Sequence, residues 1–278
     1  MKEINLYYAC RRTRNFGDLL SINISKELFG VKCNYAEPVD CEAMFIGSIF
    51  EKIIYPYRTK FHKLYHAKEK ESIKVWGSGF CAKQKKKKEQ FYREIEVYAV
   101  RGLLTRNRLE KLLQKDLKEV VIGDPGLFAA DLIKNEKIEK KFKVGIIPHY
   151  IDKNEETLKN IQLEDAVVLD VCEDGKECIR NIAKCEVIIS SSLHGLIVAD
   201  SLGIPNARII LSDKIDGGDY KYNDYYSVYG MEEHMKYDLR NEIIDENIIK
   251  AIKENYSINQ EKVQEIKNNL MEVFPYQN

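Results

Sequence analysis

The chain has 278 residues, of which 44% are hydrophobic and 32% are charged, and its 44 basic residues balance its 44 acidic ones. This length and composition predict a globular protein with a large core, divided into two domains. The zero net charge argues against bulk binding of nucleic acid. The seven cysteines lack metal-ligand spacing, so we expect reduced thiols and no metal site.

The sequence shows no targeting or membrane segment. The start, MKEINLYYAC, lacks a basic region followed by a long apolar stretch, and no window has about 18 uninterrupted apolar residues. We therefore expect a cytoplasmic protein. The basic run KQKKKK at 83–88 has two interpretations. A solvated loop is favoured, and the alternative is peripheral contact with the inner face of the membrane or with a diphosphate lipid.

In chain order, the first half alternates strand-like apolar runs with helix patterns. The strand-like runs cover residues 4–9, 43–47, 73–77, 97–100 and 120–123, and helix patterns cover 19–29 and 104–116. Parallel strands need such helical crossovers, so this half predicts a Rossmann-like α/β domain.

A polar stretch at 134–142 precedes a second series of the same kind. Its strand-like runs are KVGIIPH, AVVLDV, EVIISSS and ARIIL, with helix patterns at 175–185 and 196–203. We predict two Rossmann-like domains, residues 1–138 and 139–278. The second ends in a tyrosine-rich loop, GGDYKYNDYYSVYG, and two amphipathic helices from about Ile243.

Function is expected at the carboxyl ends of the strands, where the two domains would face each other across a cleft. The helix start in NFGD is suited to hold a phosphate or carboxylate, with a simple turn as the equal alternative. The Arg101 guanidinium fits the same anions, with a surface ion pair as its alternative. The candidate binding residues at these strand ends are Asn15, Gly17, Asp18, Gly77, Ser78, Gly79, Asp124 and His149.

The stretch SSSLHG at 190–195 places a histidine in a strand-to-helix turn. A histidine exposed to a cleft titrates near neutral pH and is suited to acid–base catalysis. Ser191, Ser192, Leu193 and the first N–H groups of the helix would hold an anion beside His194. The alternative, with equal weight on local features, is a helix-start histidine bonded to the backbone.

Taken in order, the motifs NFGD, WGSGF, VRG, GDPGL, VGIIPHY, SSLHGLIVADSLGIP and YNDYYSVYG resemble the polysaccharide pyruvyl transferase family, over about residues 6–230. The resemblance implies two Rossmann-like domains in a GT-B-type arrangement with an interdomain cleft. It also implies transfer of a pyruvyl group from phosphoenolpyruvate to two hydroxyls of a sugar, which forms a ketal without a metal or cofactor. The acceptor would be a cell-surface glycan or its lipid-linked precursor.

By the same resemblance, His194 stands at the general acid and Arg101 at an arginine that binds the donor's anionic groups. Many relatives carry an arginine directly before the Leu-His pair, whereas this chain has Ser192. Lys221, Arg208 or helix N–H groups are the candidate replacements.

Two other functions stay open. A GT-B glycosyltransferase that uses a nucleotide sugar would share the architecture, although the second domain offers no clear acidic site for a nucleotide ribose. A catalytically silent carbohydrate-binding protein is the alternative from another class. The sequence does not determine the acceptor sugar, the ketal stereochemistry or the oligomeric state.

Overall fold

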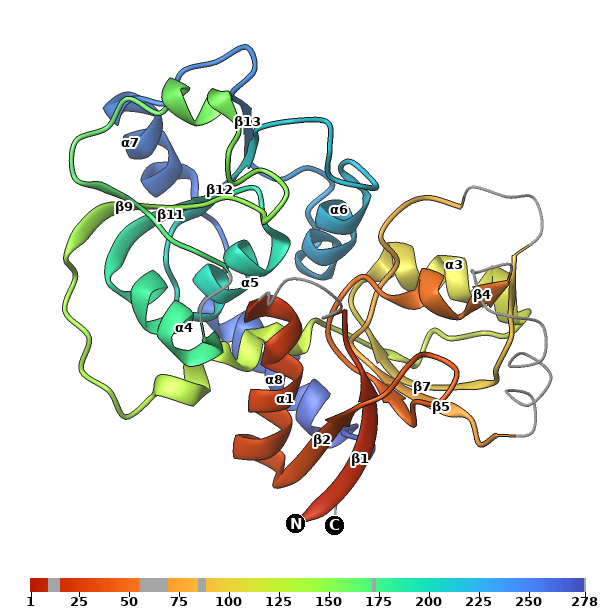
Figure 1. Cartoon of the computed structure of the whole chain (residues 1–278). Helices are drawn as coiled ribbons and strands as arrows, with labels where there is room; N and C mark the ends of the chain where they lie inside the picture. Colours follow the sequence, from red (N-terminus) through yellow and green to blue (C-terminus); the bar gives the residue numbers. More distant parts are fainter. Residues whose placement is uncertain (10–15, 56–69, 85–88, 172–173, 278) are drawn as a thin grey trace.

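The computed structural model describes residues 1–9, 16–55, 70–84, 89–171 and 174–277. Within them the chain forms an α/β fold with two parallel sheets, one in each lobe of the molecule (Figure 1). The first sheet has the order β2-β1-β3-β5-β7-β8 and the second has the order β10-β9-β11-β12-β13.

The strands of the first sheet are β1 Lys2–Tyr7, β2 Val31–Tyr35, β3 Ala43–Met44, β5 Ile73–Trp76, β7 Ile95–Val100 and β8 Val121–Ile122. Those of the second are β9 Phe142–Ile147, β10 Ala166–Val168, β11 Cys185–Ser190, β12 Asn206–Ile210 and β13 Lys236–Asp238. A short antiparallel pair, β4 Ile54–Tyr55 and β6 Gln90–Phe91, lies apart from both sheets.

The α-helices are α1 Phe16–Phe29, α3 Leu103–Leu113, α4 Gly175–Ala183, α5 Leu193–Ser201, α6 Tyr220–Tyr226, α7 Glu246–Asn255 and α8 Gln260–Glu272. Short 3-10 helices are η1 Phe50–Ile53, η2 Pro125–Ile133, η3 Glu156–Asn160 and η4 Ser227–Tyr229. Side-chain caps begin several helices, as at Asp174, Asp245 and Asn259, because their oxygens accept otherwise unpaired N–H groups. The tyrosine-rich segment predicted as a loop thus contains α6, whose tyrosines Tyr220, Tyr222, Tyr225 and Tyr226 are all buried.

One apolar core joins the two sheets. It takes residues from β1, α1 and η2 on one side and from α4, β11 and α5 on the other, together with α8. Two smaller cores cover the opposite faces of the first and second sheets. The stretch between η2 and β9, where the sequence predicts the domain boundary, has no helix or strand and is largely exposed. The boundary itself stays a prediction.

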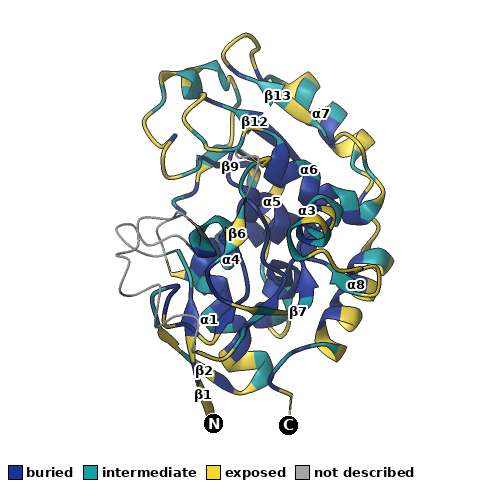
Figure 2. Cartoon of the chain, turned by 90° about the vertical axis from the view of Figure 1, so that its right-hand side faces the viewer, coloured by how far each residue is buried: buried dark blue, intermediate teal, exposed yellow. Residues whose placement is uncertain are grey.

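Helix α5 lies at the centre of the molecule, and all nine of its residues are buried (Figure 2). A helix that is apolar on most sides is expected to be buried on most sides. Its one carboxylate, Asp200, accepts hydrogen bonds from the hydroxyls of Tyr225 and Tyr256 at 2.9 and 3.0 Å. Burial raises the pKa of Asp200 to about 7. The first turn of α5 carries His194, so the rigid core positions this histidine.

The carboxyl-terminal segment packs on the first sheet, although the two are far apart in the sequence. The indole N–H of Trp76 donates to the carbonyl oxygen of Leu270 at 2.8 Å. Phe274 stacks on Phe29, with ring centroids 4.0 Å apart. The core of the first sheet is therefore completed by residues of α8 and the segment after it.

Candidate functional site

The turn between β11 and α5 is held by its own serines. The hydroxyl of Ser190 accepts a hydrogen bond from the N–H of Ser192 at 2.9 Å. The hydroxyl of Ser191 donates to the carboxylate of Asp152 at 2.8 Å and accepts from the N–H of His149 at 2.9 Å. The hydroxyl of Ser192 makes no hydrogen bond within the described residues. Ser190 and Ser191 therefore shape the turn.

His194 follows this turn, with 9% of its surface exposed. Burial, aided by the charges of Arg101, Lys221 and His149, lowers its pKa to about 3. The sequence predicted a pKa near neutral for an exposed histidine, and the difference comes from its burial beside cations. The imidazole is thus neutral at pH 7 in the ligand-free protein. Its Nε2 atom is buried without a hydrogen-bond partner among the described residues.

Gly17 brings α1 against the histidine. A Cβ at Gly17 would lie 2.0 Å from Nδ1 of His194, so only glycine permits this approach. The next residue, Asp18, is also buried, and its carboxylate makes no hydrogen bond within the described part of the chain. Burial raises the pKa of Asp18 to about 7, and the charge of Lys221 opposes that rise.

Lys221 completes what we call the His194 cluster, defined as His194, Asp18 and Lys221. The lysine lies in the first turn of α6 with 7% of its surface exposed. Burial lowers its pKa to about 8, which leaves it mostly protonated at pH 7. No ion pair with a described residue neutralises it. A buried cation without a counterion is a suitable site for an anionic ligand.

Of the candidate replacements for an arginine at position 192, Lys221 fits better than Arg208. The guanidinium of Arg208 is paired with Asp219 at 2.6 Å and lies over the ring of Tyr222. Lys221 instead acts on the pKa values of both His194 and Asp18. Of these two candidates, Lys221 is therefore the better replacement for an arginine at position 192.

Arg101 is fully buried, and protein groups occupy its guanidinium. Nε donates to Asp224 at 2.9 Å, Nη1 to the hydroxyl of Ser48 at 2.5 Å and Nη2 to the carbonyl oxygen of Phe80 at 2.6 Å. Gly79 lies against it, since a Cβ there would be 2.4 Å from Cζ of Arg101. Contact of Arg101 with a donor stays a prediction. In the structure the residue forms a buried ion pair between the end of β7 and α6.

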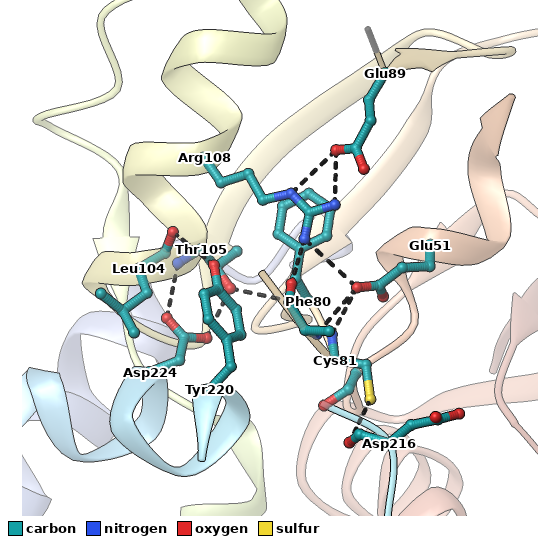
Figure 3. A network of polar contacts seen from close by, with 12 residues as sticks. Glu51, Phe80, Cys81, Glu89, Leu104, Thr105, Arg108, Asp216, Tyr220 and Asp224 are labelled. Atoms are coloured by element: carbon teal, nitrogen blue, oxygen red, sulfur yellow. Dashed lines mark hydrogen bonds and ion pairs between the residues drawn. The ribbon is translucent and has the colours of Figure 1, made fainter. Parts of the chain in front are cut away.

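Asp224 anchors α6 to the first lobe (Figure 3). Besides Arg101, its carboxylate binds the N–H and the hydroxyl of Thr105 at 2.7 and 2.6 Å. A Cβ at Gly102 would lie 1.7 Å from the carbonyl oxygen of Asp224, so glycine is required there. Residues of the motif VRG thus bind and pack against Asp224 of the motif YNDYY. This contact positions α6, and with it Lys221, beside His194.

Gly77, Ser78 and Asp124 are buried among protein groups. Gly77 has φ +87° and leaves no room for a Cβ, which would lie 2.0 Å from Cδ of Pro125. The hydroxyl of Ser78 donates to the carbonyl oxygen of Phe45 at 2.8 Å. Oδ1 of Asp124 caps η2 at 2.8 Å, whereas Oδ2 has no partner among the described residues, and burial raises the pKa of this carboxyl to about 6. All three residues support the strand ends, and a ligand contact by them stays a prediction.

His149 lies at the end of β9, near the cluster. Its Nδ1 accepts from the N–H of Ile151 at 3.3 Å, and burial lowers its pKa to about 3. Leu193, the residue before His194, is buried at the start of α5. Asn15 and most of the basic run 83–88 lie outside the described residues, so their proposed contacts stay predictions.

The family follows from a comparison with known families. The model of the polysaccharide pyruvyl transferase family matches residues 6–213, which is most of the chain. The chain belongs to this family. The match takes in the motifs from NFGD to SSLHG, so the resemblance seen in the sequence is confirmed.

Two curated proteins are similar to this chain of the pyruvyl transferase family. An uncharacterised protein of Acanthamoeba polyphaga mimivirus is 36% identical over 149 residues, which cover 51% of the chain and 52% of that protein. The succinoglycan biosynthesis protein ExoV of Rhizobium meliloti (strain 1021) is 27% identical over 231 residues, which cover 81% of the chain and 65% of that protein. The chain thus spans about half to two thirds of the length of these relatives.

Among solved structures, a functionally uncharacterised protein of Klebsiella pneumoniae subsp. pneumoniae aligns with the chain. It is 14% identical, with a TM-score of 0.46, over 81% of the chain and 87% of that protein. Within the described residues of this family member, no group of three His, Cys, Asp or Glu side chains is placed to hold a metal. None of the described helices is long and apolar enough to cross a membrane.

Sequence reasoning missed two carboxylates that organise the site. Asp152 receives the hydroxyls of Ser191 and Ser212 at 2.8 and 2.6 Å, and Asp224 holds Arg101. Asp224 stands in the motif YNDYY, which carried part of the family resemblance. The sequence therefore marked this segment, but it did not indicate that Asp224 pairs with Arg101. Asp152 stands in a polar segment without a motif, and the sequence held no signal for it.

Proposed function

We propose that this chain transfers the pyruvyl group of phosphoenolpyruvate to two hydroxyls of a sugar and releases phosphate. Membership of the pyruvyl transferase family supports the reaction class. The observation that carries the proposal is the His194 cluster. Within the described residues it joins a buried cation without a counterion to two titratable groups whose polar atoms have no hydrogen-bond partner. Phosphoenolpyruvate carries a phosphate and a carboxylate, and such an anion would neutralise Lys221.

The reaction needs one proton delivered and two hydroxyl protons removed. Protonation of the donor's methylene carbon makes its neighbouring carbon electrophilic, and the first sugar hydroxyl attacks there and loses its proton. The phosphate then leaves, the second hydroxyl attacks the same carbon, and its proton goes with the phosphate. The products are a pyruvate ketal and hydrogen phosphate. No step requires a metal or a cofactor.

His194 is the proposed acid for the methylene carbon. In the ligand-free protein, burial and neighbouring cations hold its pKa at about 3. Bound negative charge acts in the opposite direction, because it stabilises the imidazolium. We therefore expect His194 to take up a proton together with the donor. Asp18, whose pKa is about 7, is the group proposed to accept a hydroxyl proton.

The proposal includes a GT-B-type arrangement, with the donor at the turn between β11 and α5 and the acceptor approaching from between the lobes. The strand ends of both sheets supply residues to the cluster through α1, α5 and α6. The acceptor would belong to a cell-surface glycan or its lipid-linked precursor. The name of the Rhizobium relative, a succinoglycan biosynthesis protein, agrees with such an acceptor.

The test is direct detection of the ketal. The protein is incubated with phosphoenolpyruvate labelled with carbon-13 at its second carbon, a panel of methyl hexosides and a lipid extract of the host. We expect release of phosphate and a new quaternary carbon signal. In His194→Gln the side chain can still form hydrogen bonds but cannot act as an acid. Turnover should therefore fall roughly 100-fold or more, with little change in stability.

His234→Gln is the matched control, because His234 is another buried histidine, stacked between Tyr222 and Tyr226. Its turnover per folded molecule should match the wild type. Release of UDP from a UDP-sugar without phosphate release would show a glycosyltransferase instead. A ligand-induced rise in melting temperature with no turnover of any donor would show a silent sugar-binding protein.

A further inference from the structure

A hollow of about 360 Å³ opens at the carboxyl end of β12, beside the His194 cluster and separate from it. Its walls are the last residues of β12, the loop 211–219, Tyr222 and Arg240. A volume of this size is in the range of small-ligand sites, which begin at roughly 300 Å³. Polar groups converge on it, so its charge and hydrogen-bonding capacity indicate what it holds.

The charges of the hollow disfavour an anion. Two guanidinium groups, of Arg208 and Arg240, and three carboxylates, of Asp213, Asp216 and Asp219, line the hollow, so its lining has no excess of positive charge. Both cations are already paired, Arg208 with Asp219 at 2.6 Å and Arg240 with Asp213. A nucleotide or a diphosphate would therefore meet neutralised arginines and an uncompensated carboxylate.

Neutral hydrogen-bonding groups find suitable partners in the same hollow. Arg208 uses Nη1 on Asp219, while its Nε and Nη2 have no partner among the described residues. The carboxylate of Asp216 is exposed and is likewise unpaired within the described residues. The Arg208 guanidinium lies 3.7 Å over the ring of Tyr222 and so forms a flat wall. Planar donors and one free carboxylate acceptor in the lining of the same hollow match the hydroxyls of a sugar.

Two hydrogen-bond links connect this hollow to the turn that carries His194. The hydroxyl of Tyr222 donates to the carbonyl oxygen of Ser191 at 2.7 Å. Asp152 bridges Ser212, in the wall of the hollow, to Ser191 at 2.6 and 2.8 Å. A ligand in the hollow would therefore lie next to the donor site and not at a distant surface.

We propose that this hollow binds a neutral hexose unit of the acceptor glycan and so positions the acceptor beside His194. That the bound sugar is the acceptor of the pyruvyl group rests on the proposed function. That the hollow binds a neutral sugar follows from the groups in its own lining.

Saturation-transfer NMR tests the proposal with methyl hexosides and short neutral oligosaccharides as probes. The wild type should bind at least one of them, and Asp216→Asn should weaken that binding roughly 10-fold, as for the loss of a hydrogen bond to a charged group. Glu232→Gln, which alters an exposed carboxylate outside the hollow, is the matched control and should bind like the wild type. Binding of phosphoenolpyruvate, followed by calorimetry, should be the same in all three proteins.

Three results would overturn the proposal: no sugar signal with the wild type, equal sugar binding by Asp216→Asn and Glu232→Gln, or displacement of the sugar by pyrophosphate or UMP at low concentration. Failure of the proposed function looks different. In that case no phosphate is released from phosphoenolpyruvate with any acceptor, while sugar binding and its dependence on Asp216 persist.

Discussion

Replacing Arg101 with alanine should destabilise the protein strongly. Arg101 and Asp224 are both fully buried, and the arginine makes three hydrogen bonds to Asp224, Ser48 and Phe80. Removing one member of a buried ion pair leaves the other charge unpaired and costs about 3 to 5 kcal/mol. At roughly 2 to 4 °C per kcal/mol for a protein near this size, the melting temperature should fall by about 10 °C.

Urea unfolding and a donor-turnover assay on the same preparations test this reasoning. Arg180→Ala is the control, because Arg180 forms ion pairs at the surface with Glu136 and Glu177, and such pairs contribute at most about 1 kcal/mol. The double variant Arg101→Ala with Asp224→Asn should be less destabilised than the sum of the single changes, because the two residues are coupled. An Arg101→Ala variant as stable as Arg180→Ala would refute the buried-pair account and favour a direct donor contact.

Three further changes probe the site and the core. Gly17→Ala should abolish turnover, because the new Cβ would lie 2.0 Å from the ring of His194 and displace it. Gly175→Ala is the control and should keep turnover, because its Cβ would meet only the flexible side-chain amide of Asn23. Lys221→Met should raise the apparent KM for phosphoenolpyruvate about 10-fold or more without loss of stability, because it removes an unpaired buried cation; an unchanged KM contradicts this role. The pKa of Asp200 is about 7 in the folded state and about 3.8 in the unfolded chain, so between these pH values only the folded state holds the proton. Its contribution to stability is therefore complete below pH 3.8 and is lost as pH rises through 7, by roughly 4 kcal/mol at most. The free energy of unfolding of Asp200→Asn, relative to that of the wild type, should therefore rise between about pH 3.8 and pH 7. If the free energies of unfolding of the two proteins change in parallel with pH, Asp200 does not make this contribution.

The buried strands were predictable because both faces of a parallel sheet are covered. Strand β5 Ile73–Trp76 falls inside the predicted run 73–77, and β11 Cys185–Ser190 overlaps the run EVIISSS. Strand β2 Val31–Tyr35 was missed, since it lies at the edge of its sheet and only Val31 is buried. Continuous apolar sequence marks a central strand, and an edge strand lacks that signal.

Helix α6 was missed for a different reason. Its sequence, YKYNDYY, follows two glycines and contains residues with weak helix propensity. The helix forms because Asp224 and the tyrosines are buried against the first lobe and α5, and the contacts of Asp224 involve residues more than 100 positions away. The burial that shifts the pKa of His194 depends on the same long-range packing, which local sequence does not specify.

The position of α8 has a consequence for the order in which the chain folds on the ribosome. Trp76 bonds to Leu270, 194 residues later, and Phe274 stacks on Phe29. Contacts of such long separation form slowly, because the intervening loop must close first. One apolar face of the first sheet is therefore only partly covered, by Phe128 of η2, until residues 260–276 are synthesised. During that interval the nascent chain presents Trp76 and Phe29 to chaperones, and premature termination before α8 would leave this face open to aggregation.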